Sequence, residues 1–447
     1  MNIAIIGAAR SGLAAALLAK SLGHSVFLSE SRLREDFADT EQQLESAGVN
    51  YEFGANTEKA LDNADLIITS PGVPPDAWII TEAEKRAVPV ISELEFAWRH
   101  CKNQVIAITG TNGKTTTTSL IAYIFNNSGK KAVTCGNIGN PMSNVVKSIP
   151  EDTVIVVEVS SYQLDRITSF NPDVAVILNI SPDHLAYHKN MENYALTKYN
   201  IAANHNENNL LILNADDELT LAGASHTKGK AAYFSMQPVD RGIYNRDGKM
   251  CLRYPNQHKE EEIMLFEEVS LPGTHNAYNS MAAALAARAF EITNENIRDS
   301  LMKFEGVEHR LEFVRNINGV DYINDSKATN INATWYALSS YNSPLIWIAG
   351  GRGDSNNYPE LDKLVQNNVK CIIAIGEEAD NIFNHFSSMV RCYRFTSMED
   401  AVSKAYSISE KGDIVLFTPA CKSFDMFINY EHRGEIFKEI VNKLKYG

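Results

Sequence analysis

The chain has 447 residues, enough for about three domains at roughly 150 residues each. Hydrophobic residues make up 44% of it and charged residues 21%, which excludes a disordered or collagen-like chain. Its 55 acidic residues outnumber 41 basic ones, so the formal net charge is −14 and we expect neither nucleic acid nor an anionic membrane as a partner. Any anionic substrate must therefore be held by local cations, helix N-termini or metal.

The cysteines and the N-terminal segment predict a cytoplasmic protein. The 6 cysteines are scattered and form no Cys-x-x-Cys pair, which favours reduced thiols. The apolar beginning lacks a basic leader and is interrupted by Gly7, Arg10 and Gly12, so it predicts a strand, a turn and a helix rather than a signal peptide. No stretch approaches the ~20 apolar residues of a membrane span.

Short apolar runs followed by helical patterns recur along the chain and predict a parallel α/β architecture. The runs fall into three groups, which cover residues 3–6, 26–28 and 66–69; then 105–109, 154–159, 174–180 and 210–213; then 345–350, 371–376 and 413–417. We therefore predict three α/β domains over residues 1–92, 93–306 and 307–447. Residues 225–268 are polar and irregular, which favours short antiparallel strands or an insertion.

The first apolar run leads into Gly7-Ala-Ala-Arg-Ser-Gly12 and a helix, and the second leads to Glu30. This pattern is similar to a dinucleotide fingerprint with an acid about 20 residues further on. Ala9 stands where the middle glycine would let a pyrophosphate approach the backbone, which weakens an NAD role. Two alternatives stay open at this turn: binding of some other nucleotide, or a purely structural link between strand and helix.

A phosphate-binding loop is the strongest local signal. The run at 105–109 continues into Gly110-Thr-Asn-Gly-Lys-Thr115 and a helix, so backbone N–H groups and the helix N-terminus converge. Lys114 can reach the outer phosphates and Thr115 can ligate Mg²⁺. The full Walker pattern would have glycine at position 108, where Ile108 stands. The strand and helix context still predicts phosphate binding.

Three reactive side chains follow further strands of this group. Glu158 ends an apolar run, where a carboxylate is costly unless it is paired or bound to metal, and a buried salt bridge is the alternative. His184 follows the next run, at a carboxyl end where open α/β sheets bind ligands. Taken alone, His184 would be structural and Lys198 a solvated helix lysine.

Later segments offer further polar candidates. Asn276 and Asn279 lie near a helix start, where asparagine is also an ordinary cap. Arg310 follows the predicted second boundary and can reach a phosphate or fix a hinge. Asp325 and Lys327 come just after a strand in VDYINDSKATN, where the alternatives are a polar turn or a site; so many reactive types favour a site.

Together these motifs resemble the Mur ligases. GTNGKTT, VEVSSYQLD, LNISPDH, HNAYN, HRLE and NDSKATN occur in the order seen in that family, and the match spans the whole chain. NDSKATN, SPGVP and PACKSFDMF look like the members that join D-glutamate to UDP-N-acetylmuramoyl-L-alanine. The resemblance implies a Rossmann-like N-terminal domain, a central P-loop ATPase domain with a mainly parallel sheet, and a Rossmann-like C-terminal domain.

The resemblance also implies a role for each matching residue. The uridine diphosphate part of the substrate would contact Arg10, Ser11, Glu30, Ser31, Arg32, Ser70, Pro71 and Gly72. The ATP contacts would be Gly110, Thr111, Asn112, Gly113, Lys114, Thr115, Thr116, Asn276, Asn279, Arg310 and Asp325. The muramoyl side would contact Asn137, Ser160 and Gln163, and the amino acid Lys327, Thr329, Ser423 and Tyr430.

The implied catalytic residues are Lys114, Glu158, His184, Lys198 and Arg310. Thr115 and Glu158 would hold one Mg²⁺ and His184 with Lys198 a second, because in this family the lysine matching Lys198 is carbamylated. ATP would convert the terminal carboxylate of UDP-N-acetylmuramoyl-L-alanine to an acyl phosphate, which D-glutamate would then attack. Closure of the third domain onto the second should precede this chemistry.

One segment departs from the family. Members of the family usually carry a lysine in a glycine-rich segment of the third domain, where it holds the side-chain carboxylate of the amino acid. This chain has Asp354 at that position. Arg352 or Lys422 would have to compensate, and Lys422 is favoured because it adjoins Ser423.

We expect a monomer. The alternatives are another Mur-type or folylpolyglutamate synthase-like ligase with a different acceptor and, from other classes, a nucleotide-gated binding protein or an NAD-dependent oxidoreductase.

Overall fold

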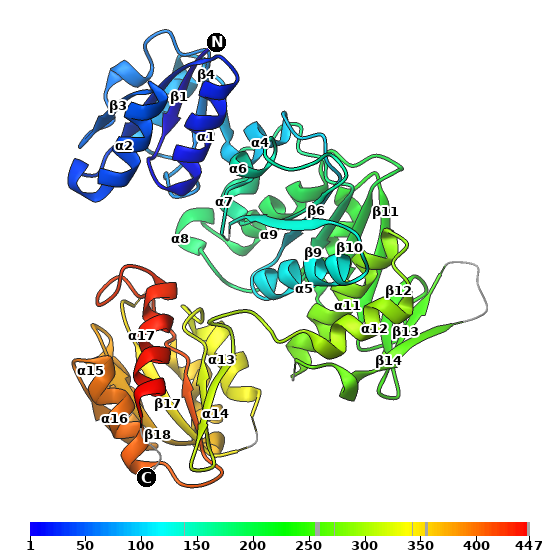
Figure 1. Ribbon diagram of the computed structural model, residues 1–447, viewed down its shortest axis with the longest axis vertical. Helices are drawn as coiled ribbons and strands as arrows, with labels where there is room; N and C mark the ends of the chain where they lie inside the picture. The colour runs from blue at the N-terminus through cyan, green and yellow to red at the C-terminus, as the bar shows by residue number, and fades with distance from the viewer. Residues whose placement is uncertain (138, 255–259, 272, 342, 354–355, 445–447) are drawn as a thin grey trace. The chain divides into compact units, whose positions relative to one another are not determined.

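The computed structural model describes residues 1–137, 139–254, 260–271, 273–341, 343–353 and 356–444 (Figure 1). The chain forms two compact units, one of residues 1–270 with 276–304 and the other of residues 271–275 with 305–447. The described residues build three sheets flanked by helices, two in the first unit and one in the second. The predicted α/β fold with three domains is therefore confirmed.

The first sheet is wholly parallel, in the order β3-β2-β1-β4-β5. Its strands are β1 (Asn2–Ile6), β2 (Ser25–Glu30), β3 (Asn50–Phe53), β4 (Leu66–Thr69) and β5 (Val90–Ser92), and its helices are α1 (Arg10–Ser21), α2 (Ala38–Ala47) and α3 (Trp78–Lys85). Successive residues of β1 enter different cores: Ile5 belongs to the same core as Ala15 of α1, and Ile6 to the same core as Ile79 of α3. Both faces are therefore covered, which explains the continuous apolar run.

The central sheet has the order β14-β13-β12-β11-β10-β9-β6-β8-β7. Its strands are β6 (Val105–Thr109), β7 (Ala132–Gly136), β8 (Val154–Glu158), β9 (Val174–Ile177), β10 (Leu210–Asn214), β11 (Lys230–Ser235), β12 (Gly242–Arg246), β13 (Lys249–Arg253) and β14 (Glu261–Leu265). Strands β6 to β12 pair in parallel, and β12, β13 and β14 form an antiparallel ribbon. The antiparallel strands expected within 225–268 are present, whereas β9 ends three residues before the predicted 180.

The helices of this part of the chain are α4 (Glu93–Trp98), α5 (Lys114–Asn127), α6 (Met142–Val145), α7 (Ser161–Leu164), α8 (Leu185–His188), α9 (Met191–Tyr199), α10 (Glu218–Ala222), α11 (Thr274–Ala289) and α12 (Asn294–Lys303). Helix α4 follows the first sheet directly and is anchored to the central domain by Glu95. This fully buried carboxylate accepts hydrogen bonds from Thr168 Oγ1 at 2.8 Å, Ser169 Oγ at 2.6 Å and the backbone amide of Phe170 at 3.0 Å. Burial would raise the pKa of Glu95, but these donors outweigh it and lower the pKa to about 2.

The third sheet lies in the second unit, in the order β15-β16-β20-β17-β18-β19, with only β15 antiparallel to its neighbour. Its strands are β15 (Glu312–Ile317), β16 (Val320–Asn324), β17 (Leu345–Gly350), β18 (Val369–Ile375), β19 (Arg391–Arg394) and β20 (Ile414–Phe417), and its helices α13 (Ile331–Ser339), α14 (Asp362–Asn368), α15 (Ala379–Phe386), α16 (Met398–Ile408) and α17 (Tyr430–Lys443). Trp347 and Ile348 of β17 belong to different cores, so this sheet is also buried on both faces.

No helix in the described part of the chain has the length and apolar character to cross a bilayer.

Candidate active site

A cavity of about 750 Å³ opens where the strand order of the first sheet reverses, between the loops that follow β1 and β4. Open α/β sheets bind ligands at this kind of switch point. The cavity is lined by all of the residues predicted to contact uridine diphosphate, namely Arg10, Ser11, Glu30, Ser31, Arg32, Ser70, Pro71 and Gly72. Asn137 and Gln163 of the central domain line it as well. The fold therefore brings together two groups of residues that are far apart in the sequence.

Glu30 is an internal acceptor of this cavity wall. Its Oε2 accepts from the Ala8 amide at 2.8 Å and its Oε1 from the Arg32 amide at 2.9 Å. Burial would raise its pKa, but these amides and the Arg32 guanidinium outweigh it and hold the pKa below its ordinary value. The Ala8 amide of the turn after β1 already donates to Glu30, so it does not point at a ligand. The turn is therefore unlike a simple pyrophosphate cradle. The NAD alternative loses further support.

Gln163 and Ser160 are held by one local motif. Gln163 Oε1 accepts from the Ser160 amide at 3.0 Å, and Ser160 Oγ accepts from the Gln163 amide at 3.4 Å, which forms a capping box at the start of α7. Gln163 Nε2 is buried and has no hydrogen-bond partner among the described residues. Gln163 lines the cavity, so this amide is a donor that a ligand can satisfy. Ser160 supports Gln163 and is not among the described lining residues of the cavity.

The loop between β6 and α5 has the geometry of a phosphate cradle. Gly110 and Gly113 have φ of +154° and +82°, and a Cβ at Gly113 would lie 2.3 Å from Asn279 Oδ1. A side chain at 113 is therefore excluded both by conformation and by space. The Asn112 amide donates to Asn179 Oδ1 at 2.8 Å, which ties the loop to the segment after β9. Sequence reasoning did not single out Asn179.

Thr115, in the first turn of α5, meets Glu158 at the carboxyl end of β8. Thr115 Oγ1 donates to Glu158 Oε2 at 2.7 Å, and Asn137 Nδ2 donates to Glu158 Oε1 at 2.9 Å. Glu158 is 1% exposed, and no ion pair is formed by it among the described residues. The buried salt bridge considered from the sequence is absent there. Two oxygen donors this close are a fitting set for Mg²⁺.

Two lysines approach the same carbonyl of the loop. Lys114 Nζ donates to Gly110 O at 2.9 Å and to Thr111 O at 2.8 Å, and Lys198 Nζ donates to Gly110 O at 2.9 Å. Lys198 is only 1% exposed, so it is not the solvated lysine that its own segment predicts. Burial, with the like charge of Lys114, lowers the pKa of Lys198 well below its ordinary value. A neutral amine at this position is the form that can add carbon dioxide.

His184 is the residue before α8 and has φ of +53°, and its Nε2 lies 3.4 Å from Asp183 Oδ2. Its ring packs against Tyr162 at a centroid distance of 5.0 Å. Asp183 also acts electrostatically on Lys198. The described contacts thus relate both His184 and Lys198 to Asp183, while the predicted joint metal site of His184 and Lys198 stays a prediction.

The remaining predicted ATP contacts of the first unit lie on α11, on α5 and in the loop before α5. Asn279 Oδ1 accepts from Thr117 Oγ1 at 3.3 Å, and Asn279 Nδ2 donates to Asn276 Oδ1 at 3.2 Å. Both asparagines are buried inside α11 beside α5 rather than capping it. Thr111 and Thr116 are buried as well. The cap interpretation is therefore wrong for Asn276 and Asn279.

In the second unit, NDSKATN meets the segment before α17. Lys327 Nζ donates to Tyr430 Oη at 3.3 Å, and Ser326 Oγ donates to Tyr430 O at 2.8 Å. Arg433, which sequence reasoning missed, joins the two segments through bonds to Ser326 O at 2.7 Å and Cys421 O at 3.0 Å. These contacts bring Lys327 and Tyr430 together.

The other predicted amino-acid contacts lie nearby in the chain. Ser423 is buried, and its carbonyl accepts from the Phe427 amide at 2.9 Å. The Thr329 amide donates to Lys327 O at 3.0 Å. Lys422 forms a short antiparallel bridge with Arg352. Asp354, where the family lysine was expected, lies outside the described residues.

Asp325 is a buried carboxylate at the end of β16. Its Oδ1 accepts from the Leu311 amide at 3.2 Å, and its Oδ2 accepts from Thr418 Oγ1 at 3.0 Å. Burial raises the pKa of Asp325 to about 6 despite the nearby Arg310 charge. Asp325 therefore anchors the backbone next to Arg310, in addition to any contact with a nucleotide.

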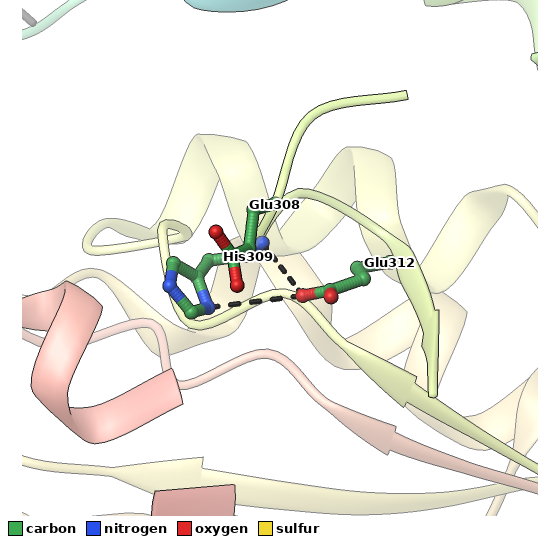
Figure 2. Close-up of side chains that lie close together, drawn as sticks. All are labelled: Glu308, His309 and Glu312. Atoms are coloured by element: carbon green, nitrogen blue, oxygen red, sulfur yellow. Dashed lines mark hydrogen bonds and ion pairs between the residues drawn. The ribbon is translucent and has the colours of Figure 1, made fainter. Parts of the chain in front are cut away.

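Glu308, His309 and Glu312 form a group of residue types that can hold a metal ion, with ligand atoms within 4.8 Å of one another (Figure 2). Figure 2 shows His309 and Glu312 pointing toward each other across the turn. However, Lys438 Nζ donates to Glu312 Oε1 at 2.9 Å and also to Glu308. An ammonium already neutralises these carboxylates, which argues against a metal there.

Comparison with known proteins identifies the family of this chain. Residues 1–92, 108–287 and 309–421 match the Mur ligase MurD-like N-terminal domain, the Mur ligase middle domain and the Mur ligase glutamate ligase domain. The UDP-N-acetylmuramoylalanine--D-glutamate ligase of Salinibacter ruber is 43% identical over 98% of this chain and 97% of its own. The ligase of the same name from Chloroherpeton thalassium is 43% identical over 99% and 98%. The chain therefore belongs to the Mur ligase family of enzymes.

Solved structures share the fold at lower identity. The UDP-N-acetylmuramate-alanine ligase of Thermotoga maritima superposes with a TM-score of 0.62 and 19% identity, covering 100% of both chains. A pseudomurein peptide ligase type C from Methanothermus fervidus superposes with a TM-score of 0.60 and 21% identity, covering 99% of this chain and 100% of its own. At these identities the likeness supports the three-domain fold alone.

Proposed function

We propose that the chain is an ATP-dependent ligase that joins D-glutamate to the terminal carboxylate of UDP-N-acetylmuramoyl-L-alanine, a step of peptidoglycan precursor synthesis. The observation that carries this proposal is the 43% identity, over nearly the whole chain, to relatives of that name. The cavity at the first sheet supports it because its 750 Å³ of space is lined by Arg10, Arg32 and the turns around them. A large anionic nucleotide sugar suits such a site.

The first chemical step follows from the phosphate loop. A carboxylate is a poor acyl donor, so an oxygen of the alanyl carboxylate attacks the γ-phosphorus of ATP, the bond to the β-phosphate oxygen breaks, and ADP leaves. The backbone of Gly110–Thr115 and the Lys114 ammonium hold the phosphates and offset their charge. Mg²⁺, held by Thr115 and Glu158, would supply further charge stabilisation. Lys114 must exchange its loop carbonyls for phosphate oxygens.

The second step forms the amide. The nitrogen of D-glutamate attacks the carbonyl carbon of the acyl phosphate, the carbon–oxygen bond to phosphate breaks, and the amine loses a proton. The proposed contacts of the amino acid are Lys327, Thr329, Lys422, Ser423 and Tyr430.

The proposed further contacts or supports of ATP are Asn276, Asn279, Arg310 and Asp325. The proposed second metal site consists of His184 and a carbamylated Lys198. We also propose a monomeric, cytoplasmic enzyme.

The test is an omission experiment with the purified chain. ATP, UDP-N-acetylmuramoyl-L-alanine and D-glutamate together should yield ADP, phosphate and the amide in equal amounts, identified by mass. Leaving out either organic substrate should abolish steady ADP formation. ADP release without an organic substrate would favour a nucleotide-gated binding protein, and hydride transfer with NAD would favour an oxidoreductase; either result would contradict the proposal.

A further inference from the structure

The loop that carries Arg310 is wound in an unusual conformation. Gly306 has φ of +97°, and the two residues that flank Arg310, His309 and Leu311, have φ of +64° and +44°. Residues with a side chain rarely adopt this left-handed region, and a leucine does so less readily than a histidine. Such a conformation persists only where surrounding contacts determine it.

Carboxylates anchor the backbone of both strained residues. The His309 amide donates to Glu312 Oε2 at 2.8 Å, and the Leu311 amide donates to Asp325 Oδ1 at 3.2 Å. The Lys327 amide closes the loop from the other side by donating to His309 O at 3.1 Å. Of these anchors, Glu312 is the one at the surface, with a side chain that is 23% exposed.

Lys438 of α17 fixes that exposed anchor. Its Nζ donates to Glu312 Oε1 at 2.9 Å and also to Glu308, while Asn324 Nδ2 donates to Glu312 Oε2 at 3.0 Å. Helix α17 also packs closely on the loop, because a Cβ at Gly434 would lie 2.3 Å from His309 Nδ1. Both oxygens of Glu312 are thus occupied, and its orientation toward the His309 amide is set (Figure 2).

Arg310 itself is left available by these contacts. Its guanidinium is half-buried, forms no ion pair with the described residues, and has a buried Nε without a hydrogen-bond partner among them. The buried Arg433 of the same unit differs, since its guanidinium is satisfied by Ser326 and Cys421. A partly desolvated arginine with an unsatisfied Nε is suited to bind an anion such as a phosphate.

We infer that Lys438 is a positioning residue, which holds Glu312 and Glu308 so that the left-handed loop presents Arg310 to a phosphate. The part that concerns phosphate rests on the proposed function, in which Arg310 contacts ATP. Lys438 touches no substrate in this scheme and acts only through the loop. A merely structural role would instead stabilise α17 without any specific effect on the use of ATP.

Hydrogen exchange of the substrate-free chain tests the support without reference to the reaction. Lys438→Met should increase amide exchange in a peptide covering residues 306–312, because Glu312 loses its fixed orientation. Lys443→Met is the matched control, since Lys443 lies on the same helix in an exposed pair with Glu439. It should leave that peptide unchanged. Equal exchange in wild type and Lys438→Met would overturn the inference, whether or not the chain is a ligase.

Steady-state kinetics tests whether Lys438 affects the use of ATP through Arg310. Lys438→Met should lower kcat/KM for ATP about tenfold while KM for D-glutamate changes less than about twofold, and Lys438→Arg should restore most of the loss. In an Arg310→Ala background, Lys438→Met should have almost no further effect, because the two residues act as one unit. Multiplicative losses in the double variant, or equal losses for all substrates, would overturn the inference. An inactive wild type would instead contradict the proposed function and leave the exchange result to decide.

Discussion

Arg352 and Lys422 face each other across an antiparallel bridge, in which the Arg352 amide donates to Lys422 O at 2.8 Å and the Lys422 amide to Arg352 O at 2.9 Å. Residues directly opposite in an antiparallel pair project their side chains to the same face. The Arg352 guanidinium is bound by Glu377, with Nε and Nη2 at 3.1 and 2.9 Å from its carboxylate oxygens. The register thus places two cations side by side, with Arg352 held by an acid.

Lys422 adjoins the buried Ser423, and we propose it as the cation that holds the side-chain carboxylate of the amino acid. Lys422→Ala should raise KM for D-glutamate at least about tenfold, about 1.4 kcal/mol of binding, with KM for ATP nearly unchanged. Arg352→Ala is the matched comparison on the same bridge and should have a smaller effect. If Arg352→Ala gives the loss and Lys422→Ala does not, the role belongs to Arg352.

Glu158→Gln should remove most activity and leave the fold intact. Glutamine keeps the shape and one oxygen acceptor but loses the charge that would hold Mg²⁺, so kcat should fall about 100-fold or more. Thr115→Ser is a fitting control, because the hydroxyl that donates to Glu158 at 2.7 Å is retained. A Glu158→Gln variant that melts several degrees lower but turns over normally would show that the carboxylate has a structural role only.

Lys198 should carry a carbamate in the working enzyme. Its depressed pKa supplies the neutral amine that adds carbon dioxide, with loss of a proton, to give an oxygen ligand in place of a cation. Protein incubated with ¹³C-bicarbonate should show a carbamate carbon signal by NMR. The signal should disappear in Lys198→Met together with activity, and persist in Lys131→Met, whose lysine lies in an exposed pair with Asp152. Full activity of Lys198→Met would rule the carbamate out.

Glu95 predicts a specific pH dependence of stability. Its pKa of about 2 lies below the ordinary 4.5, so its contribution is complete above about pH 4.5 and is lost as the pH falls toward 2. The shift corresponds to a stabilisation on the order of 3 kcal/mol at neutral pH. Glu95→Gln should therefore be less stable than wild type at pH 7, and the difference should fall below half near about pH 3.

Urea unfolding of the first unit, followed at each pH, measures this difference. Glu151→Gln is the control, because Glu151 forms an exposed pair with Lys102 and its replacement should change stability little at any pH. A Glu95→Gln difference that stays constant from neutral to acidic pH would show that packing, rather than the charged carboxylate, accounts for the stabilisation.

The sequence predicted the buried strands well and the edge strands poorly. Apolar runs such as residues 105–109 are unambiguous because both faces of a parallel sheet are covered. Strand β3 carries the partly exposed sequence NYEF, and β5 has three residues, so neither gives a continuous apolar signal. The order of strands, which creates the cavity at the first sheet, depends on pairing and cannot be read from any one segment.

The site residues also fall into two groups: those in a contiguous motif, which the sequence reveals, and those with partners distant in sequence, which it does not. The phosphate loop was visible because strand, glycines, lysine and helix are contiguous. The burial of Lys198 was not visible, since its partner Gly110 O lies 88 residues earlier in the chain. Glu95, Asn179, Arg433 and Lys438 were missed for the same reason: each is a common polar residue whose importance comes from partners distant in sequence.

The choice of amino acid tests the central claim most directly. Phosphate release should be measured with ATP and UDP-N-acetylmuramoyl-L-alanine while D-glutamate, L-glutamate, D-aspartate, L-alanine and L-lysine are supplied one at a time. The account predicts that D-glutamate alone supports rapid release, with kcat/KM at least about 100-fold above every other amino acid. Equal or faster release with another amino acid would contradict it and would make the chain a Mur ligase with a different acceptor.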